Sequence, residues 1–429
     1  MRQINIAIVG LGQIGNYLYN ELIAKKKDIE IKTGKKIQIV AISAKNINKK
    51  RKFKINKKIF YKNPLDIIKH KKVDVLIEAI GFADGLSKKI VENALKNKIH
   101  VITPNKALIS KHGDYLSFLA EKNKVNLEFE AAVAGGIPIV RTIKEGLATN
   151  KITKVYGILN GTCNYILSQM EKTKDSFKNV LKNAQKLGYA EPGNPKLDLN
   201  GYDALAKVKI LSALAFNCKI SKSQSLMEGI EKIEATDFDI VEKLNLRIKL
   251  LGITEIINNK IFERVHPCLV SRDSYIGNVT NVMNAVILEG KPVGESVMQG
   301  EGAGPGPTTS ALMSDLLSIL RGNIKFPFGI SNNKRNISNS YNYNSYENSL
   351  YLRVEVKDKP GVLSSITNIL AKNNISVQRL IQIPDNMKKT ASIIIITHKC
   401  KEINSSKCIK MLKKASNIIK EPNLIRIFN

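Results

Sequence analysis

Apolar positions in the first third of the chain form two kinds of run. Short, nearly continuous apolar runs are typical of strands buried on both faces of a parallel sheet, and they occupy 4–9, 37–42, 73–80, 100–103 and 126–130. Between the first two runs, apolar residues recur at helical spacing over 16–24. Strands that alternate with helices predict an α/β fold, here a Rossmann-type doubly wound parallel sheet over about 1–140.

The middle of the chain has a different pattern. The segment 204–216 is apolar nearly all the way round, which predicts a buried helix. Strand-like runs at 154–159 and 282–288 predict a sheet that is able to pair across a two-fold axis. We expect an α+β domain over about 141–325, of which about 302–325 returns to complete the first domain.

The last third begins with 331–348, a segment rich in Asn, Ser and Tyr without periodicity, which predicts a flexible linker. Beyond it, strand patterns lie at 351–356, 375–382, 391–397 and 424–427, and helical patterns at 362–371 and 406–419. This β-α-β-β-α-β order predicts a ferredoxin-like domain over 349–429. It contains no catalytic constellation, so we interpret it as a binding or regulatory module.

A glycine-rich turn joins the first strand to the first helix. Gly10, Gly12 and Gly15, with Gln13 and Ile14 between them, have the G-x-G-x-x-G spacing. Glycines at this place permit a tight turn and let backbone N–H groups approach a pyrophosphate. The turn therefore predicts a dinucleotide site.

The residues after the second strand bear on which dinucleotide is bound. An NAD-selective site usually has a carboxylate there for the ribose 2′-hydroxyl, but this chain has Lys45, Lys49, Lys50 and Arg51. We expect NADP, with NAD as the alternative. In a lysine-rich chain, composition alone could also produce this pattern.

The net charge of +31 invites comparison with nucleic-acid-binding proteins. Most of the cations are Lys, spread over the predicted helix surfaces, whereas Arg, which reads guanine and phosphate bidentately, is sparse. We therefore expect no nucleic-acid partner.

No apolar run approaches the ~20 residues of a membrane span, and five scattered cysteines favour neither a disulfide framework nor a zinc site. We expect a cytoplasmic protein without a membrane partner.

Asp203 and Lys207 are the first candidates for chemistry, because residues four apart share one helix face. The helical neighbours of Lys207 include Ala204, Ile210 and Leu211, and an ammonium on an apolar face needs a partner or a role. Burial disfavours the charged state of a lysine, which makes it a better proton donor near neutral pH. A surface Asp–Lys pair is the alternative.

Two further candidates follow predicted strands. Lys106 comes just after 100–103, and Glu130 ends 126–130 and precedes a glycine-rich segment. Ligands of open α/β sheets bind at the carboxyl ends of the strands, which makes both residues site candidates by position. The alternative is that they are ordinary loop residues.

Taken together, these motifs resemble the homoserine dehydrogenase family, in its long form with a C-terminal ACT domain. The resemblance covers essentially the whole chain and rests on seven stretches in this order: 10–15, 103–108, 130–138, 160–165, 188–192, 198–207 and 302–308. The family reduces L-aspartate 4-semialdehyde to L-homoserine with NAD(P)H, on the route to threonine, methionine and isoleucine. The resemblance implies that 141–325 binds substrate and dimerises.

The resemblance also implies a role for each matching residue. Lys207 is the proton donor, and Lys106 lies between nicotinamide and substrate. The implied substrate-binding residues are Gly161, Thr162, Glu191, Asp198 and Asp203. The implied cofactor-binding residues are Gly10, Gly12, Gln13, Ile14, Gly15, Lys45, Thr103, Lys106, Gly188 and Gly302. A monovalent cation, Na⁺ or K⁺, is implied at Glu130, Val133, Gly135 and Ile137, mostly through backbone carbonyls.

One departure from the family concerns Lys45, where relatives often carry Arg, so the expected preference for NADP is weaker. We expect a homodimer or homotetramer and a small amino-acid effector, threonine first, at the ACT domain near Gly361. Three alternatives stay open: another ACT-regulated NADP-dependent dehydrogenase of amino-acid metabolism, a catalytically inactive amino-acid sensor, and a basic nucleic-acid-binding protein.

Overall fold

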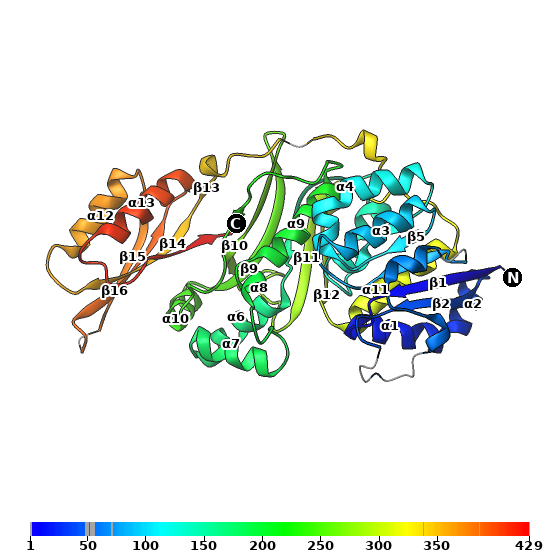
Figure 1. Ribbon diagram of the computed structural model, residues 1–429. Helices are drawn as coiled ribbons and strands as arrows, with labels where there is room; N and C mark the ends of the chain where they lie inside the picture. The colour runs from blue at the N-terminus through cyan, green and yellow to red at the C-terminus, as the bar shows by residue number, and fades with distance from the viewer. Residues whose placement is uncertain are drawn as a thin grey trace.

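The computed structural model describes residues 2–47, 51, 56–69, 72–337, 339–385 and 387–428. The chain forms three units in a row, with the N-terminal and C-terminal units on either side of a middle domain (Figure 1). This arrangement places the N-terminal unit and the middle domain in contact, and the catalytic candidates lie at that boundary.

The N-terminal unit is built on a parallel six-stranded sheet of order β3-β2-β1-β4-β5-β6. Its strands are β1 (Gln3–Val9), β2 (Lys36–Ser43), β3 (Phe60–Tyr61), β4 (Val75–Glu78), β5 (His100–Ile102) and β6 (Leu127–Glu128). This order is that of a Rossmann fold, as predicted. It brings the carboxyl ends of β1, β4 and β5 together at one edge, with Val9 opposite Glu78 and Ile77 opposite Ile102.

Helices cover the two faces of this sheet. They are α1 (Gln13–Ala24), α2 (Lys26–Thr33), α3 (Leu86–Lys96), α4 (Lys106–Lys122) and, from much later in the chain, α11 (Pro305–Leu320). Leu312 and Leu316 of α11 pack in one core with Leu18 of α1 and Ile6 and Ile8 of β1. The helix after Gly302 thus completes the first domain.

The middle domain contributes six strands of a larger sheet and six helices. The strands are β7 (Lys151–Ile158), β8 (Leu226–Met227), β9 (Leu246–Ile257), β10 (Lys260–Ser271), β11 (Met283–Lys291) and β12 (Gly294–Glu301). The helices are α5 (Ile139–Arg141), α6 (Gly161–Thr173), α7 (Phe177–Lys186), α8 (Lys196–Leu199), α9 (Tyr202–Ala215) and α10 (Ala235–Lys243). The predicted helix at 204–216 is α9, and most of its side chains are buried.

The C-terminal unit has the predicted ferredoxin-like order. It consists of β13 (Glu347–Asn348), β14 (Leu350–Lys357), α12 (Val362–Lys372), β15 (Val377–Asp385), β16 (Thr390–Thr397), β17 (Cys400–Lys401), α13 (Glu402–Lys414) and β18 (Asn423–Ile427). Its sheet is continuous with that of the middle domain, in the order β12-β11-β7-β9-β10-β18-β14-β16-β15. The joint is a short parallel pairing in which Cys268 and Leu269 of β10 lie beside Arg426 and Ile427 of β18.

The expectation of a flexible linker over 331–348 is wrong. The guanidinium of Arg335 is buried: it donates to the carbonyl of Cys218 at 2.7 and 2.9 Å and lies 2.8 Å from the Asp114 carboxylate. Tyr341 and Tyr346 pack against Phe262 with ring centroids 5.4 and 4.9 Å apart. Together with the continuous sheet, these contacts hold the C-terminal unit against the middle domain as a docked body, not as a tethered one.

Some predicted boundaries also differ. The last helix spans Glu402–Lys414 instead of 406–419, and the strand predicted at 126–130 ends at Glu128 because Glu130 begins a short 3-10 turn. The strands at 154–159 and 282–288 are β7 and β11, both inside the sheet, and the edge strand on that side is β12. Edge-to-edge pairing with a second copy would therefore use β12.

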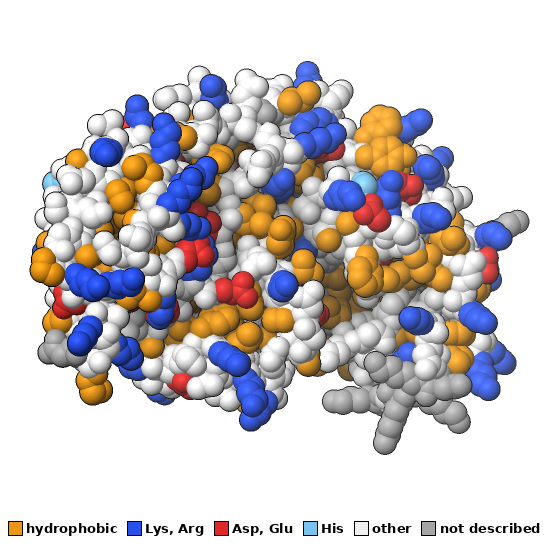
Figure 2. Space-filling view, turned by 60° about the vertical axis from the view of Figure 1, so that its left-hand side comes forward, with side chains coloured by type: hydrophobic (Ala, Val, Ile, Leu, Met, Phe, Trp, Pro, Cys, Tyr) orange, Lys and Arg blue, Asp and Glu red, His pale blue; other side chains and the backbone are white. Residues whose placement is uncertain are grey.

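The structure bears on both the excess of positive charge and the question of a membrane span. On the face shown in Figure 2, Lys and Arg side chains are scattered among apolar and acidic ones and form no continuous band. Among the described helices, none is both long and apolar enough to cross a membrane.

Candidate active site

The glycine turn between β1 and α1 has room for a ligand at one position and is closed at two others. Gly10 has φ +101°, and a Cβ there would lie 2.4 Å from the carbonyl oxygen of Ala79. A Cβ on Gly15 would lie within 1.9 Å of the Gly10 carbonyl oxygen, whereas a Cβ on Gly12 would meet nothing within 4 Å. Gly10 and Gly15 therefore make the turn tight, and Gly12 leaves open space where a pyrophosphate could approach the backbone. The exposed Gln13 and half-buried Ile14 begin α1 beside this space.

A buried polar network supports the same sheet edge. Thr103 is fully buried; its hydroxyl donates to Glu78 at 2.6 Å and accepts from the backbone N–H of Asn105 at 3.0 Å. The other Glu78 oxygen accepts from Ser87 and from the backbone of Ile80. Thr103 is thus a member of this network and has no exposed surface. The network fixes the start of α4, where Lys106 lies.

Two lysines from different domains bind the same carboxylate. Nζ of Lys106 lies 2.8 Å from Oδ1 of Asp203, and Nζ of Lys207 lies 2.8 Å from Oδ2. Lys207 is 7% exposed and also donates to the backbone carbonyl of Leu159 at 2.6 Å, so the tip of its side chain is not in the apolar environment that the sequence predicted. The Lys106 side chain is 42% exposed, which places it at the mouth of the site.

The charges at this centre shift the pKa of Asp203 and the pKa of Lys106 in definite directions. Burial alone would raise the pKa of Asp203, but the ammonium groups of Lys207 and Lys106 outweigh it and hold that pKa well below its usual range. The carboxylate of Asp203 in turn raises the pKa of Lys106 against the effect of its burial. The carboxyl group of Asp203 and the amino group of Lys106 are therefore both ionised near neutral pH.

The side chain of Asn160 makes contacts in the site that the sequence did not predict. Its side-chain amide donates to Asp198 at 2.8 Å and to Asp203 at 3.0 Å, and its oxygen caps α6 by accepting from the backbone of Cys163. Burial, and next the charge of Asp203, raise the pKa of Asp198, so two neighbouring carboxylates are shifted in opposite directions. An Asn just before a helix is a recognisable cap, but its two carboxylate partners are far away in the sequence.

The other predicted substrate residues lie around this centre. Gly161 begins α6, and a Cβ there would lie 2.7 Å from the carbonyl oxygen of Val282. The hydroxyl of Thr162 donates to the carbonyl of Tyr189 at 2.6 Å, next to the positive-φ Gly188. Glu191 is exposed, and among the described residues its carboxylate forms no hydrogen bond. Its charge nevertheless contributes to the raised pKa of Lys106.

The end of β2 supplies the cations expected near an adenosine ribose. Lys45 is exposed just past the strand, and the backbone of Ser43 accepts from Gly10, which ties the strand end to the glycine turn. Arg51 uses its guanidinium to hold the carbonyls of Asn46 and Ile47. Lys49 and Lys50 lie outside the described residues.

The four predicted cation ligands share one turn. Both carboxylate oxygens of Glu130 accept backbone N–H groups at the start of α5, from Val140 and Arg141 at 2.8 Å, and burial raises the pKa of Glu130. Val133, Gly135 and Ile137 are buried on the same turn. Among the described residues, no group of three or more His, Cys, Asp or Glu side chains could hold a metal ion, so a cation here would depend on backbone carbonyls.

Gly302 closes this turn from the other side. A Cβ on Gly135 would lie 2.6 Å from the carbonyl oxygen of Gly302, and a Cβ on Gly302 would overlap the side chain of Asn284 at 2.0 Å. The predicted cofactor loop and the predicted cation loop are therefore packed backbone to backbone, just before α11. A side chain at Gly135 would collide with backbone, and one at Gly302 would have to displace the buried Asn284.

Fold and site together define a nicotinamide-dependent dehydrogenase, in which a Rossmann domain with a fitting glycine turn meets a lysine–carboxylate–lysine centre at its ligand-binding edge. The family models agree: one for homoserine dehydrogenase matches residues 138–317, one for the homoserine dehydrogenase NAD-binding domain matches 10–130, and one for the ACT domain matches 350–415. The chain belongs to the homoserine dehydrogenase family and is an oxidoreductase acting on a CH–OH group.

Individual relatives are similar over the full length. A homoserine dehydrogenase from Neisseria gonorrhoeae is 37% identical over 100% of this chain and 99% of its own. The crystal structure of a homoserine dehydrogenase from Thiobacillus denitrificans superposes with a TM-score of 0.91 at 34% identity, covering 100% of this chain and 99% of that one. A hyperthermophilic archaeal homoserine dehydrogenase solved in complex with NADPH shares the fold, with a TM-score of 0.62 at 22% identity over 75% of this chain and 100% of its own.

Proposed function

We propose that this chain interconverts L-aspartate 4-semialdehyde and L-homoserine with NADP(H), with Lys207 as the proton donor. The observation that carries the proposal is the buried ammonium of Lys207, held by the Leu159 carbonyl and by Asp203, which itself binds Lys106. A bound nicotinamide supplies or accepts the hydride at the carbonyl carbon. When the aldehyde carbon gains a hydride, its oxygen needs a proton, and Lys207 gives one.

The other residues bind and orient the substrate in this proposal. The carboxylates of Asp198, Asp203 and Glu191 attract the substrate ammonium. The start of α6, capped by Asn160 and followed by Gly161 and Thr162, offers backbone N–H groups to the substrate carboxylate. Lys106 is placed between nicotinamide and substrate. We further propose a Na⁺ or K⁺ ion on the turn of Glu130, Val133, Gly135 and Ile137.

The setting of this activity belongs to the same proposal. We infer a cytoplasmic enzyme of threonine, methionine and isoleucine biosynthesis that works as a homodimer or homotetramer. The decisive experiment is a spectrophotometric assay of homoserine oxidation with NADP and NAD in parallel. Turnover with either coenzyme supports the proposal, and a folded protein that turns over neither refutes it.

Coenzyme choice is expected to depend on Lys45. Its exposed ammonium follows β2, where a ribose 2′-phosphate would lie, and the NADPH complex of the archaeal relative supports a site of this kind. In Lys45→Asp we expect the ratio of kcat/KM for NADP to that for NAD to fall by about tenfold or more, since one charge-assisted contact is worth about 1.5–3 kcal/mol. A carboxylate repels the 2′-phosphate and can bind the 2′-hydroxyl.

The matched control is Lys89→Asp, the same charge change on an exposed position of α3. It should leave the coenzyme ratio unchanged. If Lys45→Ala leaves the KM for NADP at the wild-type value, Lys45 is not the phosphate ligand.

The ACT domain is expected to bind a small amino acid at Gly361, with threonine as the favoured effector. Gly361 precedes α12 at φ +83°, and a Cβ there would meet nothing within 4 Å, so the helix N–H groups are open to a carboxylate. Gly361→Ala places a methyl group in that space. We expect calorimetry on the full chain to show threonine binding weakened at least tenfold.

Gly322→Ala is the control for backbone strain, because Gly322 has φ +86° and similar open space after α11. Its threonine affinity should equal that of the wild type. The alternative is that the ACT domain only helps the chain to assemble, and wild-type protein without measurable threonine binding would favour that alternative.

A further inference from the structure

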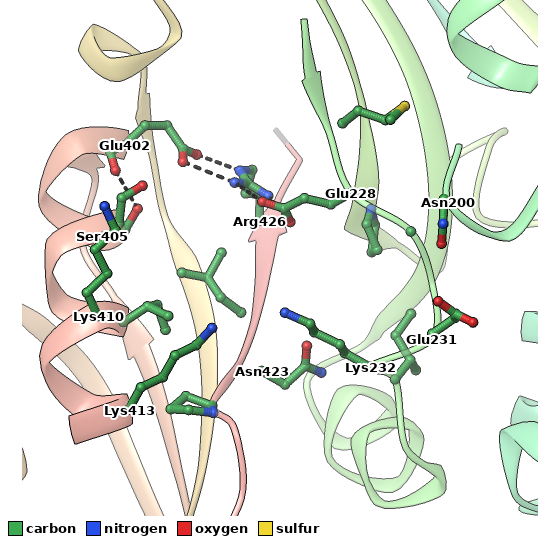
Figure 3. A pocket seen from close by; sticks show the side chains of 18 residues that line it. Asn200, Glu228, Glu231, Lys232, Glu402, Ser405, Lys410, Lys413, Asn423 and Arg426 are labelled. Carbon is green, nitrogen blue, oxygen red and sulfur yellow. Dashed lines mark hydrogen bonds and ion pairs between the residues drawn. The ribbon is translucent and has the colours of Figure 1, made fainter. Parts of the chain in front are cut away.

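A cavity of about 500 Å³ lies between the middle domain and the ACT domain. One wall is the segment 227–233 with Asn200 and Pro267, and the opposite wall is α13 together with the start of β18 (Figure 3). The volume is within the range of small-metabolite sites. It is separate from the Lys106–Asp203–Lys207 centre and from the Gly361 turn, neither of which lines it.

The arginine in the cavity is already paired with carboxylates. The buried guanidinium of Arg426 binds both oxygens of Glu402, at 2.5 and 3.0 Å, and both oxygens of Glu228, at 2.8 Å. These two carboxylates come from opposite sides of the domain junction, so the Arg426 cluster joins the domains. With one guanidinium and two carboxylates, the cluster carries a net charge of −1, and Arg426 is not available to a ligand anion.

The three lysines that line the cavity, Lys232, Lys410 and Lys413, do not take part in the Arg426 cluster. Lys232 and Lys413 come from opposite walls and point toward one another (Figure 3), and both reach the same oxygen of Glu421, at 2.6 and 2.5 Å. Lys410 lines the cavity as well and forms no ion pair with any described residue. Glu231 also lines the cavity, but its carboxylate points away from the lysines (Figure 3). Lys232 and Lys413 thus share one exposed carboxylate, whereas the side chain of Lys410 extends toward Ser405 (Figure 3).

An exposed ion pair of this kind is weak and can be exchanged. Glu421 lies outside the cavity lining, and its hydrogen bonds to Lys232 and Lys413 lower its pKa to about 2, so it stays ionised as their partner. A ligand carboxylate could replace it at no net cost in charge pairing. The remaining lining includes Met227, Ile409 and Leu424, which suit a short aliphatic group.

We propose that this cavity binds a small aliphatic amino acid, whose carboxylate is held by Lys232 and Lys413 and whose side chain packs on Ile409 and Leu424, with Lys410 adding a third positive charge to the lining. It is a second ligand site, apart from the one proposed at Gly361. The chemistry of the lining, an anion-binding edge over an apolar floor, carries this assignment.

The cavity wall is in direct contact with the segment that carries the active-site carboxylates. The backbone N–H of Ile230 donates to the Leu199 carbonyl at 3.1 Å, and a Cβ on Gly229 would lie 2.2 Å from the same oxygen. Leu199 directly follows Asp198 and ends α8, four residues before Asp203. A ligand that fixes 227–233 would therefore change the position of Asp198, and we expect a change in the KM for homoserine.

The test is titration calorimetry on the full chain with L-valine, L-leucine and L-isoleucine, each alone. At least one should bind, and isobutylamine, which is valine without its carboxylate, should not. Lys410→Ala/Lys413→Ala should weaken the affinity at least tenfold, whereas Glu421→Gln, which frees two lysines, should strengthen it several-fold. Opposite effects from these exposed positions cannot come from a general loss of stability.

Lys372→Ala, an exposed lysine at the end of α12, is the matched control and should bind as the wild type does. The basal dehydrogenase activity of Lys410→Ala/Lys413→Ala should also equal that of the wild type, but its KM should no longer respond to the amino acid. Absence of binding by all three amino acids overturns the proposal. So does binding that survives Lys410→Ala/Lys413→Ala, including binding that is lost in Gly361→Ala instead.

Discussion

Lys207→Ala is expected to lower kcat for homoserine oxidation by about 10²–10⁴-fold, the usual contribution of a positioned general acid or base. The ammonium of Lys207 is buried, and its two acceptors, Leu159 and Asp203, fix its position. The glycine turn is in another domain, so the affinity for NADP should stay at the wild-type value. Steady-state kinetics together with a coenzyme titration measure both quantities.

Lys209→Ala is the matched control on the same helix. Among the described residues, Nζ of Lys209 hydrogen-bonds the carbonyl of Ser223, at 3.5 Å, and no residue of the proposed site, so its removal should leave kcat within about twofold of the wild type. Wild-type kcat in a correctly folded Lys207→Ala protein would show that the proton comes from another group.

The sequence could predict the parts of the site that depend on local spacing. The glycine turn needs only a strand, three glycines and a helix in register, and Asp203 and Lys207 need only a four-residue separation on one helix. The pairing of Lys106 with Asp203 spans the domain boundary. Position at a strand end made Lys106 a candidate, but no local pattern could name its partner.

The same limit explains what the sequence did not predict. Asn160 binds Asp198 and Asp203, which lie 38 and 43 residues further on, and only the folded chain brings the three together. The pairing of β18 with β10 joins strands that are more than 150 residues apart, so it left no local signal. For the segment 331–348, the polar composition predicted a tether, although Arg335 and the tyrosines were a sign that part of it is buried.

Asp203→Asn is expected to reduce kcat by about 10²-fold, because a displacement of catalytic groups by about 1 Å costs that much. The carboxylate holds Lys106 and Lys207 at 2.8 Å each, and an amide can accept from only one side, so the two ammonium groups would no longer share a partner. Removing one member of a buried ion pair is strongly destabilising, by about 3–5 kcal/mol, and because Lys106 is partly exposed we expect the lower end of that range.

The pH dependence of this loss has a definite sign. Asp203 has an ordinary pKa of about 3.9 in the unfolded chain, and in the folded chain Lys207 and Lys106 hold its pKa lower, against the effect of burial. A carboxylate of this kind stabilises the fold above its unfolded pKa, and the stabilisation is lost as the pH falls through the folded pKa. The difference in free energy of unfolding between wild type and Asp203→Asn should thus be equal at pH 7 and pH 5 and smaller at pH 3.

Urea unfolding at the three pH values measures this difference. The control is Asp239→Asn, an exposed partner of Lys174, which should show little loss at any pH. A difference that stays constant down to pH 3 would mean that the charge of Asp203 does not stabilise the fold.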